Sequence, residues 1–185
     1  MRSKKTGWIF DGGGFTGAYG AGFALGLWDV FKPEYVQGVS AGALNATKVA
    51  EANEVGELGA IWRGVIEKNG PQAIFNKYQA IGSILKGLAG RNCNCLFDNR
   101  GLRELINILD VGKVAQSAIH LDLVVTNETR SNEKEIFSNR DNWQPENYEI
   151  FKRIICASCS LMGTFPPVRI GVDTYSDGID YDLEA

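Results

Sequence analysis

The chain alternates between short apolar runs and longer segments whose apolar residues follow helical spacing. Residues 6–10 form an apolar run that stops at three glycines, and small and apolar residues then continue over 16–31 without a proline. This pattern predicts a strand, a tight loop and a helix. Residues 35–39 predict a second strand, and the alanine-rich segment 41–52 predicts a helix that begins directly after Ser40.

The same alternation continues to the end of the chain. Helices are predicted over 58–66, within 71–90, from Asp98 or Asn99 through Leu109, and over 148–157. Strands are predicted over 119–126, 135–138 and 168–172, and a short run at 174–176 leads into Asp177-Gly178. Parallel neighbours need a crossover connection, so this order favours an α/β fold with a parallel sheet and helices packed on its faces.

One predicted helix carries an apolar stripe whose partner the pattern leaves open. Its apolar residues fall three or four positions apart, and Lys77 and Lys86 lie off the stripe. The stripe consists of Ile74, Tyr78, Ile81, Leu85 and Leu88. We expect it to pack on the core, and the alternative is a cap that faces substrate or a lid that touches a membrane.

Composition and charge narrow the class of protein. The 185 residues are 44% hydrophobic and 22% charged, as in ordinary globular domains, which excludes disordered, collagen-like and coiled-coil chains. We expect one domain over residues 1–185. The net charge of −3 has the wrong sign for a domain that holds nucleic acid by neutralising phosphates, although a local basic patch remains open.

The sequence also carries expectations about location and metal binding. No apolar run reaches the length of a membrane span, and the apolar run after the basic start is too short for a signal peptide, so we expect a cytoplasmic protein. Its cysteines are therefore expected to be reduced packing residues. They are Cys93, Cys95, Cys156 and Cys159. A zinc site is the alternative, but no finger or ribbon spacing surrounds them, and we expect no metal.

A G-x-S-x-G pattern stands where a predicted strand meets a predicted helix. It reads Gly38-Val39-Ser40-Ala41-Gly42, and in this context the pattern makes a nucleophile elbow. The sharp reversal from strand to helix strains the backbone of the serine. The residues two positions before and two positions after the serine must lack bulky side chains. The N-terminus of the next helix favours an alkoxide at Ser40, which makes it a candidate nucleophile. The alternative is an ordinary tight turn.

The glycine loop after the first predicted strand is a candidate oxyanion hole. It reads Asp11-Gly12-Gly13-Gly14-Phe15-Thr16-Gly17, so backbone N–H groups of Gly12, Gly13 and Gly14 are able to converge on one oxygen atom. Gly12, Gly14 and Gly17 also fit the dinucleotide pattern G-x-G-x-x-G. Asp11 would face a pyrophosphate there, and no acidic residue ends the second strand to bind ribose hydroxyls. A Walker loop fails because Gly17 is followed by alanine and tyrosine.

A serine nucleophile needs a base, and the sequence offers two candidates. The single histidine, His120, lies in an apolar strand-like run, where a structural role is the usual explanation. Asp177 lies in a tight Asp-Gly turn, and partial burial would raise the pKa of its carboxyl toward the range useful for proton transfer. The alternative for Asp177 is a solvated turn residue.

Taken in order, the glycine loop, the serine elbow and Asp177-Gly178 resemble the patatin-like phospholipase family. Further matches extend along the chain, in Leu96-Phe97-Asp98, in Ala157-Ser158-Cys159-Ser160 and in Phe165-Pro166-Pro167-Val168. The resemblance implies one acyl hydrolase domain, shortened at its C-terminal end, with a three-layer α/β/α fold and a mainly parallel sheet. It implies a Ser40–Asp177 dyad, an oxyanion hole at residues 12–14, and no cofactor.

The implied activity is hydrolysis of carboxylic esters of phospholipids or other lipids through an acyl-enzyme, with peripheral membrane contact and no nucleic-acid partner. Two residues depart from the family pattern: Thr16 stands where an arginine or lysine is usual, and Ile179 where a glycine or alanine is usual. These departures favour, as the alternative, a catalytically weak relative that binds lipid or a partner. The oligomeric state is left open.

Overall fold

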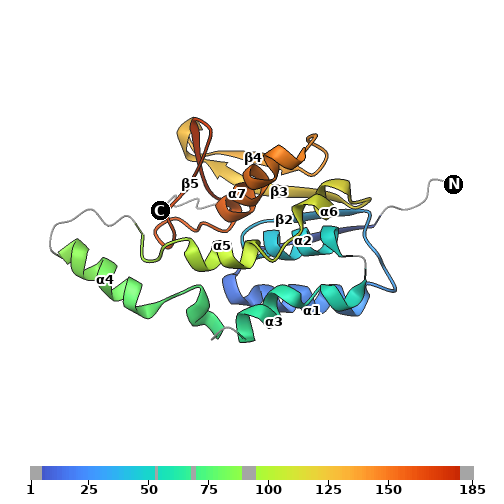
Figure 1. The fold of residues 1–185 in the computed structure, drawn as a ribbon, viewed down its shortest axis with the longest axis horizontal. Helices are drawn as coiled ribbons and strands as arrows, with labels where there is room; N and C mark the ends of the chain where they lie inside the picture. Colours follow the sequence, from blue (N-terminus) through green and yellow to red (C-terminus); the bar gives the residue numbers. More distant parts are fainter. Residues whose placement is uncertain (1–5, 53, 68–69, 89–94, 180–185) are drawn as a thin grey trace, which may run out of the picture.

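A mixed sheet forms the frame of the protein (Figure 1). The computed structural model describes residues 6–52, 54–67, 70–88 and 95–179. Within them the strand order is β1-β2-β3-β6-β5, and β4 pairs with the other edge of β3. The strands are β1 (Gly7–Phe10), β2 (Tyr35–Gly38), β3 (His120–Asn127), β4 (Glu133–Ser138), β5 (Val168–Ile170) and β6 (Asp173–Asp177).

The strand directions correct the expectation of a mainly parallel sheet. Strands β1, β2 and β3 run parallel, as predicted, whereas β4 and β6 are antiparallel to β3 and β5 is antiparallel to β6. Two of the three antiparallel pairs, β3–β4 and β5–β6, are joined by short connections, which need no crossover helix. Between β5 and β6 the turn is only two residues long, and Gly171 there has a φ of 63°.

The described helices follow the predicted order, with one addition. They are α1 (Gly17–Leu27), α2 (Ala41–Glu51), α3 (Ala60–Glu67), α4 (Lys77–Leu88), α5 (Arg100–Ile106), α6 (Val111–Gln116) and α7 (Tyr148–Ser158). The helix predicted from residue 98 or 99 through 109 ends at Ile106, and the unpredicted α6 begins after Asp110. Asp110 is the N-cap of α6, because its side chain accepts the Lys113 N–H at 3.2 Å.

Helices α2 and α7 pack against the strands and cover one face of the sheet (Figure 1). Burial alternates along β3: Leu121, Leu123 and Val125 are fully buried under the helices, while the residues between them are partly exposed. On the uncovered face, Ile9 and Ile136 are exposed. The predicted three layers are therefore two in the described part of the chain, because successive right-handed crossovers in one direction place α1 and α2 on the same side.

Helix α2 is buried along its whole length, whereas α4 projects from the body of the molecule (Figure 1). The expectation that the apolar stripe packs on the core is wrong for α4, where Tyr78, Ile81 and Leu85 are exposed. Helical spacing defines an apolar face but not what that face meets. No helix in residues 6–52, 54–67, 70–88 and 95–179 has the length and apolar character of a membrane span.

Strand β3 brings the ends of two other strands together. Gly38 at the end of β2 pairs with Leu123, and Asp177 at the end of β6 pairs with Val125. Both strands use the same edge of β3, because β4 occupies the opposite edge throughout this stretch. The residues that follow β2 and β6 therefore meet beside the middle of β3.

Candidate active site

Ser40 occupies the sharp turn between β2 and α2. Its φ of 55° and ψ of −131° lie in a region that non-glycine residues rarely adopt, and it is 8% exposed. A side chain at Gly38 would overlap the backbone of Gly42, and one at Gly42 would overlap the carbonyl of Phe10. The two glycines of the predicted nucleophile elbow are thus required by close backbone packing, as the pattern predicts.

The C-terminal end of α7 holds the backbone of Ser40 on both sides. The Ser40 N–H donates to Ser158 Oγ at 3.2 Å, and Ser158 Oγ donates to the carbonyl of Val124 in β3 at 2.8 Å. The thiol of Cys159 donates to the Ser40 carbonyl at 3.0 Å. The sequence indicated Ser158 only as part of a family match and Cys159 also as a packing cysteine. Neither contact with Ser40 was predicted, because no spacing rule links positions more than a hundred residues apart.

Asp177 lies beside Ser40 with a buried carboxyl group. It is 3% exposed, and its N–H donates to the carbonyl of Ser160 at 3.0 Å. Oδ1 accepts the Ile179 N–H at 3.0 Å, and Oδ2 is buried without a hydrogen-bond partner among the described residues. Burial raises the pKa of Asp177 to about 6, although the Ser40 side chain and the Ile179 N–H each lower it in part. Asp177 is therefore buried and is not a solvated turn residue.

The glycine loop lies beside Ser40: a side chain at Gly12 would approach Ser40 Cβ to 3.0 Å. The Gly12 N–H donates to Asp11 Oδ1 at 2.7 Å, so it is already bonded. Gly13 and Gly14 have φ values of 140° and 58° and line the cavity beside Ser40. Of the three predicted oxyanion residues, Gly13 and Gly14 are therefore the better placed.

Two observations remove support from the dinucleotide alternative. The Gly12 N–H that would bind a pyrophosphate is bonded to Asp11. A side chain at Gly17 would approach the Trp62 ring to 2.6 Å, so the last glycine of the pattern is explained by helix packing. Trp62 itself is fixed by Asn45, whose side chain accepts the indole N–H at 2.8 Å.

An apolar cavity of about 220 Å³ opens beside Ser40. Its wall is formed by the glycine loop, the starts of α2 and α5, the segment before α4 and the chain after α7. The lining residues are Gly13, Gly14, Phe15, Ser40, Ala41, Leu44, Trp62, Ile74, Phe75, Leu102, Cys159, Leu161, Thr164, Phe165 and Ile179. Phe75 joins three aromatic rings there, with centroid distances of 5.2 Å to Phe15, 5.2 Å to Phe97 and 5.4 Å to Phe165. The cavity suits a hydrocarbon chain.

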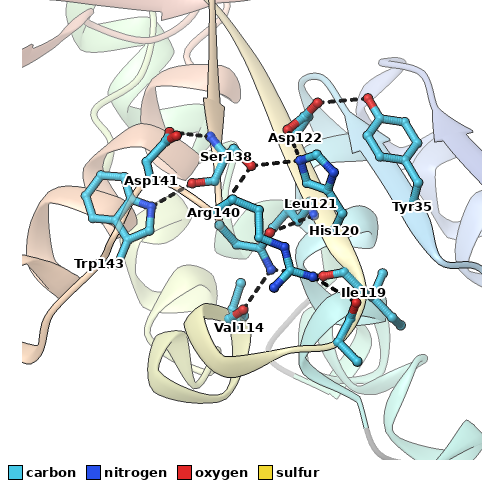
Figure 2. A network of polar contacts seen from close by, with 12 residues as sticks. Tyr35, Val114, Ile119, His120, Leu121, Asp122, Ser138, Arg140, Asp141 and Trp143 are labelled. Atoms are coloured by element: carbon cyan, nitrogen blue, oxygen red, sulfur yellow. Dashed lines mark hydrogen bonds and ion pairs between the residues drawn. The ribbon is translucent and has the colours of Figure 1, made fainter.

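His120 lies away from this site, in a polar network on the uncovered face of the sheet (Figure 2). It pairs with Tyr35 at the start of β2, whereas Ser40 follows the end of that strand. Its Nε2 lies 2.9 Å from Ser138 Oγ and 3.0 Å from Asp122 Oδ1. Both neighbours contact the same ring nitrogen, so this is not the arrangement of a Ser-His-Asp triad.

Two of the cysteines are packing residues of the core. Cys156 and Cys159 are buried, and burial raises the pKa of both thiols. Cys93 lies outside the described residues. Among the described residues, no group of three metal-ligating side chains comes together. The zinc alternative therefore gains no support.

Comparison with known proteins identifies the family. A sequence model of the family described as patatin-like phospholipase matches residues 9–179. The chain belongs to the patatin-like phospholipase family. Members of this family are generally lipid acyl hydrolases. No curated protein matches the chain.

The fold of VipD from Legionella pneumophila agrees with the patatin-like family assignment. Its crystal structure superposes with a TM-score of 0.52 at 17% sequence identity, over 94% of this chain. The chain spans 46% of the length of VipD. At this identity the likeness shows the fold alone.

The two departures from the patatin-like pattern lie directly at the glycine loop. Thr16 donates to the Gly13 carbonyl through both its N–H, at 3.2 Å, and its hydroxyl, at 2.9 Å, so it supports the loop without a charge. Ile179 lines the cavity, and a side chain at Gly12 would overlap it. Ile179 therefore occupies space beside Ser40 that a smaller residue would leave open.

Proposed function

We propose that this protein is a serine acyl hydrolase that cleaves carboxylic esters of phospholipids or other lipids through a Ser40–Asp177 dyad. One observation carries the proposal. Ser40, held at a φ of 55° on the wall of an apolar cavity, lies beside a buried carboxyl whose Oδ2 has no hydrogen-bond partner in the described structure. A buried acceptor of this kind beside a strained serine is typical of a nucleophile and its base.

In the acylation step, Asp177 accepts the hydroxyl proton as Ser40 Oγ attacks the ester carbonyl carbon. The carbonyl oxygen becomes an oxyanion, and the N–H groups of Gly13 and Gly14 stabilise it. The carbon–oxygen bond to the alcohol then breaks, and Asp177 returns its proton to the leaving alkoxide. The alcohol or lyso-lipid departs, and the acyl group remains on Ser40.

Deacylation repeats the sequence with water. Asp177 accepts a proton from the water molecule that attacks the acyl-enzyme, and the same N–H groups stabilise the second oxyanion. Collapse of that intermediate releases the fatty acid and returns the proton to Ser40 Oγ. The pKa of about 6 suits Asp177 to both proton transfers near neutral pH.

The lining of the cavity supports a lipid substrate. Its walls are mainly aliphatic and aromatic side chains, and Ser40 is among the few polar side chains that line it. This arrangement fits an acyl chain inside the cavity and its ester group at the serine. Operation without a cofactor, without nucleic acid and in the cytoplasm stays a prediction from the sequence.

A fluorophosphonate probe tests the proposal, because only an activated serine reacts with it rapidly. Intact mass is measured for the wild type, Ser40→Ala, Asp177→Asn and Ser138→Ala. Ser138 serves as the control, since its hydroxyl contacts His120 on the uncovered sheet face. We expect one adduct on the wild type and on Ser138→Ala, none on Ser40→Ala, and at least about a hundredfold slower labelling of Asp177→Asn. Labelling of folded Ser40→Ala would contradict the proposal.

The position of Ile179 favours one alternative, a relative that binds lipid but turns it over weakly. Its side chain narrows the space beside Ser40 and lies against the loop that would hold the oxyanion. Ile179→Ala and Ile179→Gly separate the two functions. For the hydrolase, we expect both variants to shift selectivity toward bulkier esters, measured as kcat/KM. For the weak relative, lipid hydrolysis by the wild type equals that of Ser40→Ala, while vesicles are still bound.

A further inference from the structure

Helix α4 carries an exposed apolar face. Tyr78, Ile81, Ile84 and Leu85 are 73%, 53%, 53% and 60% exposed. With about 100° of rotation per residue, these positions span an arc of roughly 120° on one side of the helix. An isolated exposed apolar residue is ordinary, but four on one face of one helix mark an interaction surface.

The opposite side of α4 is attached to the body of the protein. Gln79 Nε2 donates to Asp98 Oδ2 at 3.0 Å, and Ser83 Oγ donates to the Leu96 carbonyl at 3.2 Å. These two residues lie one turn apart, on the side away from the apolar arc. The helix projects from the body of the molecule (Figure 1) and is held so that its apolar face is exposed.

The charge on α4 has a single sign. Its sequence contains Lys77 and Lys86 and no acidic residue. Lys77 Nζ lies 5.3 Å from the centroid of the Tyr78 ring, so one positive charge lies at the N-terminal end of the apolar arc. A lysine next to an apolar helix face fits a partner that carries negative charge at its surface and has an apolar interior.

The exposed face lies close in the chain to the cavity that holds Ser40. Ile74 and Phe75, which line that cavity, immediately precede α4 in the chain. Beside α4, the exposed Leu96 donates its N–H to the Gly163 carbonyl at 3.1 Å, and the exposed Met162 is next to that glycine. Apolar side chains thus extend from the helix to the segment that closes the cavity.

We propose that α4 is the membrane-docking element of this protein, with its apolar face inserted among the acyl chains of a bilayer and Lys77 against anionic headgroups. The occupant we commit to is a lipid surface, and the inference rests on the proposed lipid hydrolysis. In this position the cavity faces the bilayer from which a substrate chain is drawn. The helix lies in the plane of the interface and does not cross it.

Vesicle sedimentation of the Ser40→Ala protein tests the proposal without hydrolysis of the vesicles. The probes are phosphatidylcholine vesicles with and without phosphatidylserine. We expect Ile81→Ser with Leu85→Ser to weaken partitioning by at least about tenfold. Lys77→Gln should cost about fivefold on anionic vesicles only, an effect that high salt removes. The matched control is Ile136→Ser with Val172→Ser, exposed residues remote from α4, which should leave binding unchanged.

A second assay separates this inference from the proposed function. The second assay uses a protein that keeps Ser40 and carries Ile81→Ser and Leu85→Ser. Its hydrolysis of a monomeric short-chain ester should stay at the wild-type rate, and this result also shows that the variant folds. Hydrolysis of vesicle lipid should fall with binding. Unchanged vesicle binding by the α4 variants overturns the inference. So does a dimer in lipid-free solution that these substitutions dissociate, because the face would then bind a second copy. Ester hydrolysis that survives Ser40→Ala overturns the proposed function alone.

Discussion

The burial of Asp177 determines how the proposed activity should depend on pH. As the proposed base it must be ionised, and burial raises its pKa to about 6. We expect kcat/KM for a soluble ester to fall about tenfold per pH unit as the pH drops below 6. A pH–rate profile of the wild type provides the measurement. An acidic limb near pH 4 would place the titrating group elsewhere.

The same residue couples pH to stability. The pKa of Asp177 is raised in the folded protein above the ordinary value of 3.8, so the stability it contributes is present below pH 3.8 and is lost as pH rises through about 6. Asp177→Asn does not titrate. The unfolding free energy of Asp177→Asn should therefore exceed that of the wild type by an amount that grows between pH 4 and pH 7, to about 3 kcal/mol at most. Urea unfolding at several pH values measures it, and a constant difference contradicts the prediction.

Two glycines should affect stability in opposite directions when each is replaced by alanine. A side chain at Gly42 would overlap the carbonyl of Phe10, whereas one at Gly22 in α1 meets no atom within 4 Å. We expect Gly42→Ala to destabilise the protein by at least about 2 kcal/mol. Gly22→Ala should stabilise it by up to about 1 kcal/mol through helix propensity. Thermal unfolding compares the two, and equal shifts would show that the elbow is not tightly packed.

Among the elements, the C-terminal end of α7 is the one that fixes the nucleophile. Ser158 accepts from Ser40 and donates to Val124, so Ser158→Ala leaves a buried N–H and a buried carbonyl without these partners. We expect a loss of about 1–3 kcal/mol in stability and a fall in kcat of about tenfold with KM nearly unchanged. Ser138→Ala is the control and should leave kcat unaltered. A change in KM alone would argue against a positioning role.

The elements also show which structure can be inferred from local sequence. The order of strands and helices follows from apolar runs and caps, and the elbow at Ser40 follows from its place between strand and helix. The antiparallel pairing of β6 with β3 does not, because it joins residues that are distant in the chain. The exposure of α4 and the contacts of Ser158 depend on residues distant in the chain. Local patterns carry no such information.

At the scale of the whole molecule, β3 is the central strand. It pairs with β2, β4 and β6, and Leu121, Leu123 and Val125 are fully buried. We expect amide hydrogen exchange to be slowest over β3 and much faster over α4, which joins the body through few contacts. Hydrogen-exchange mass spectrometry measures both in one experiment. Equal protection of α4 and β3 would mean that α4 unfolds only with the whole domain.

The meeting of β2 and β6 on one edge of β3 also determines when the site comes into existence. Ser40 leaves the ribosome before its partner carboxylate, which belongs to β6. A nascent chain therefore carries the nucleophile without its base while residues 41–176 are made. Under the proposed mechanism, lipid cleavage begins only when β6 docks, so a chain that still lacks β6 is harmless to the membranes around it.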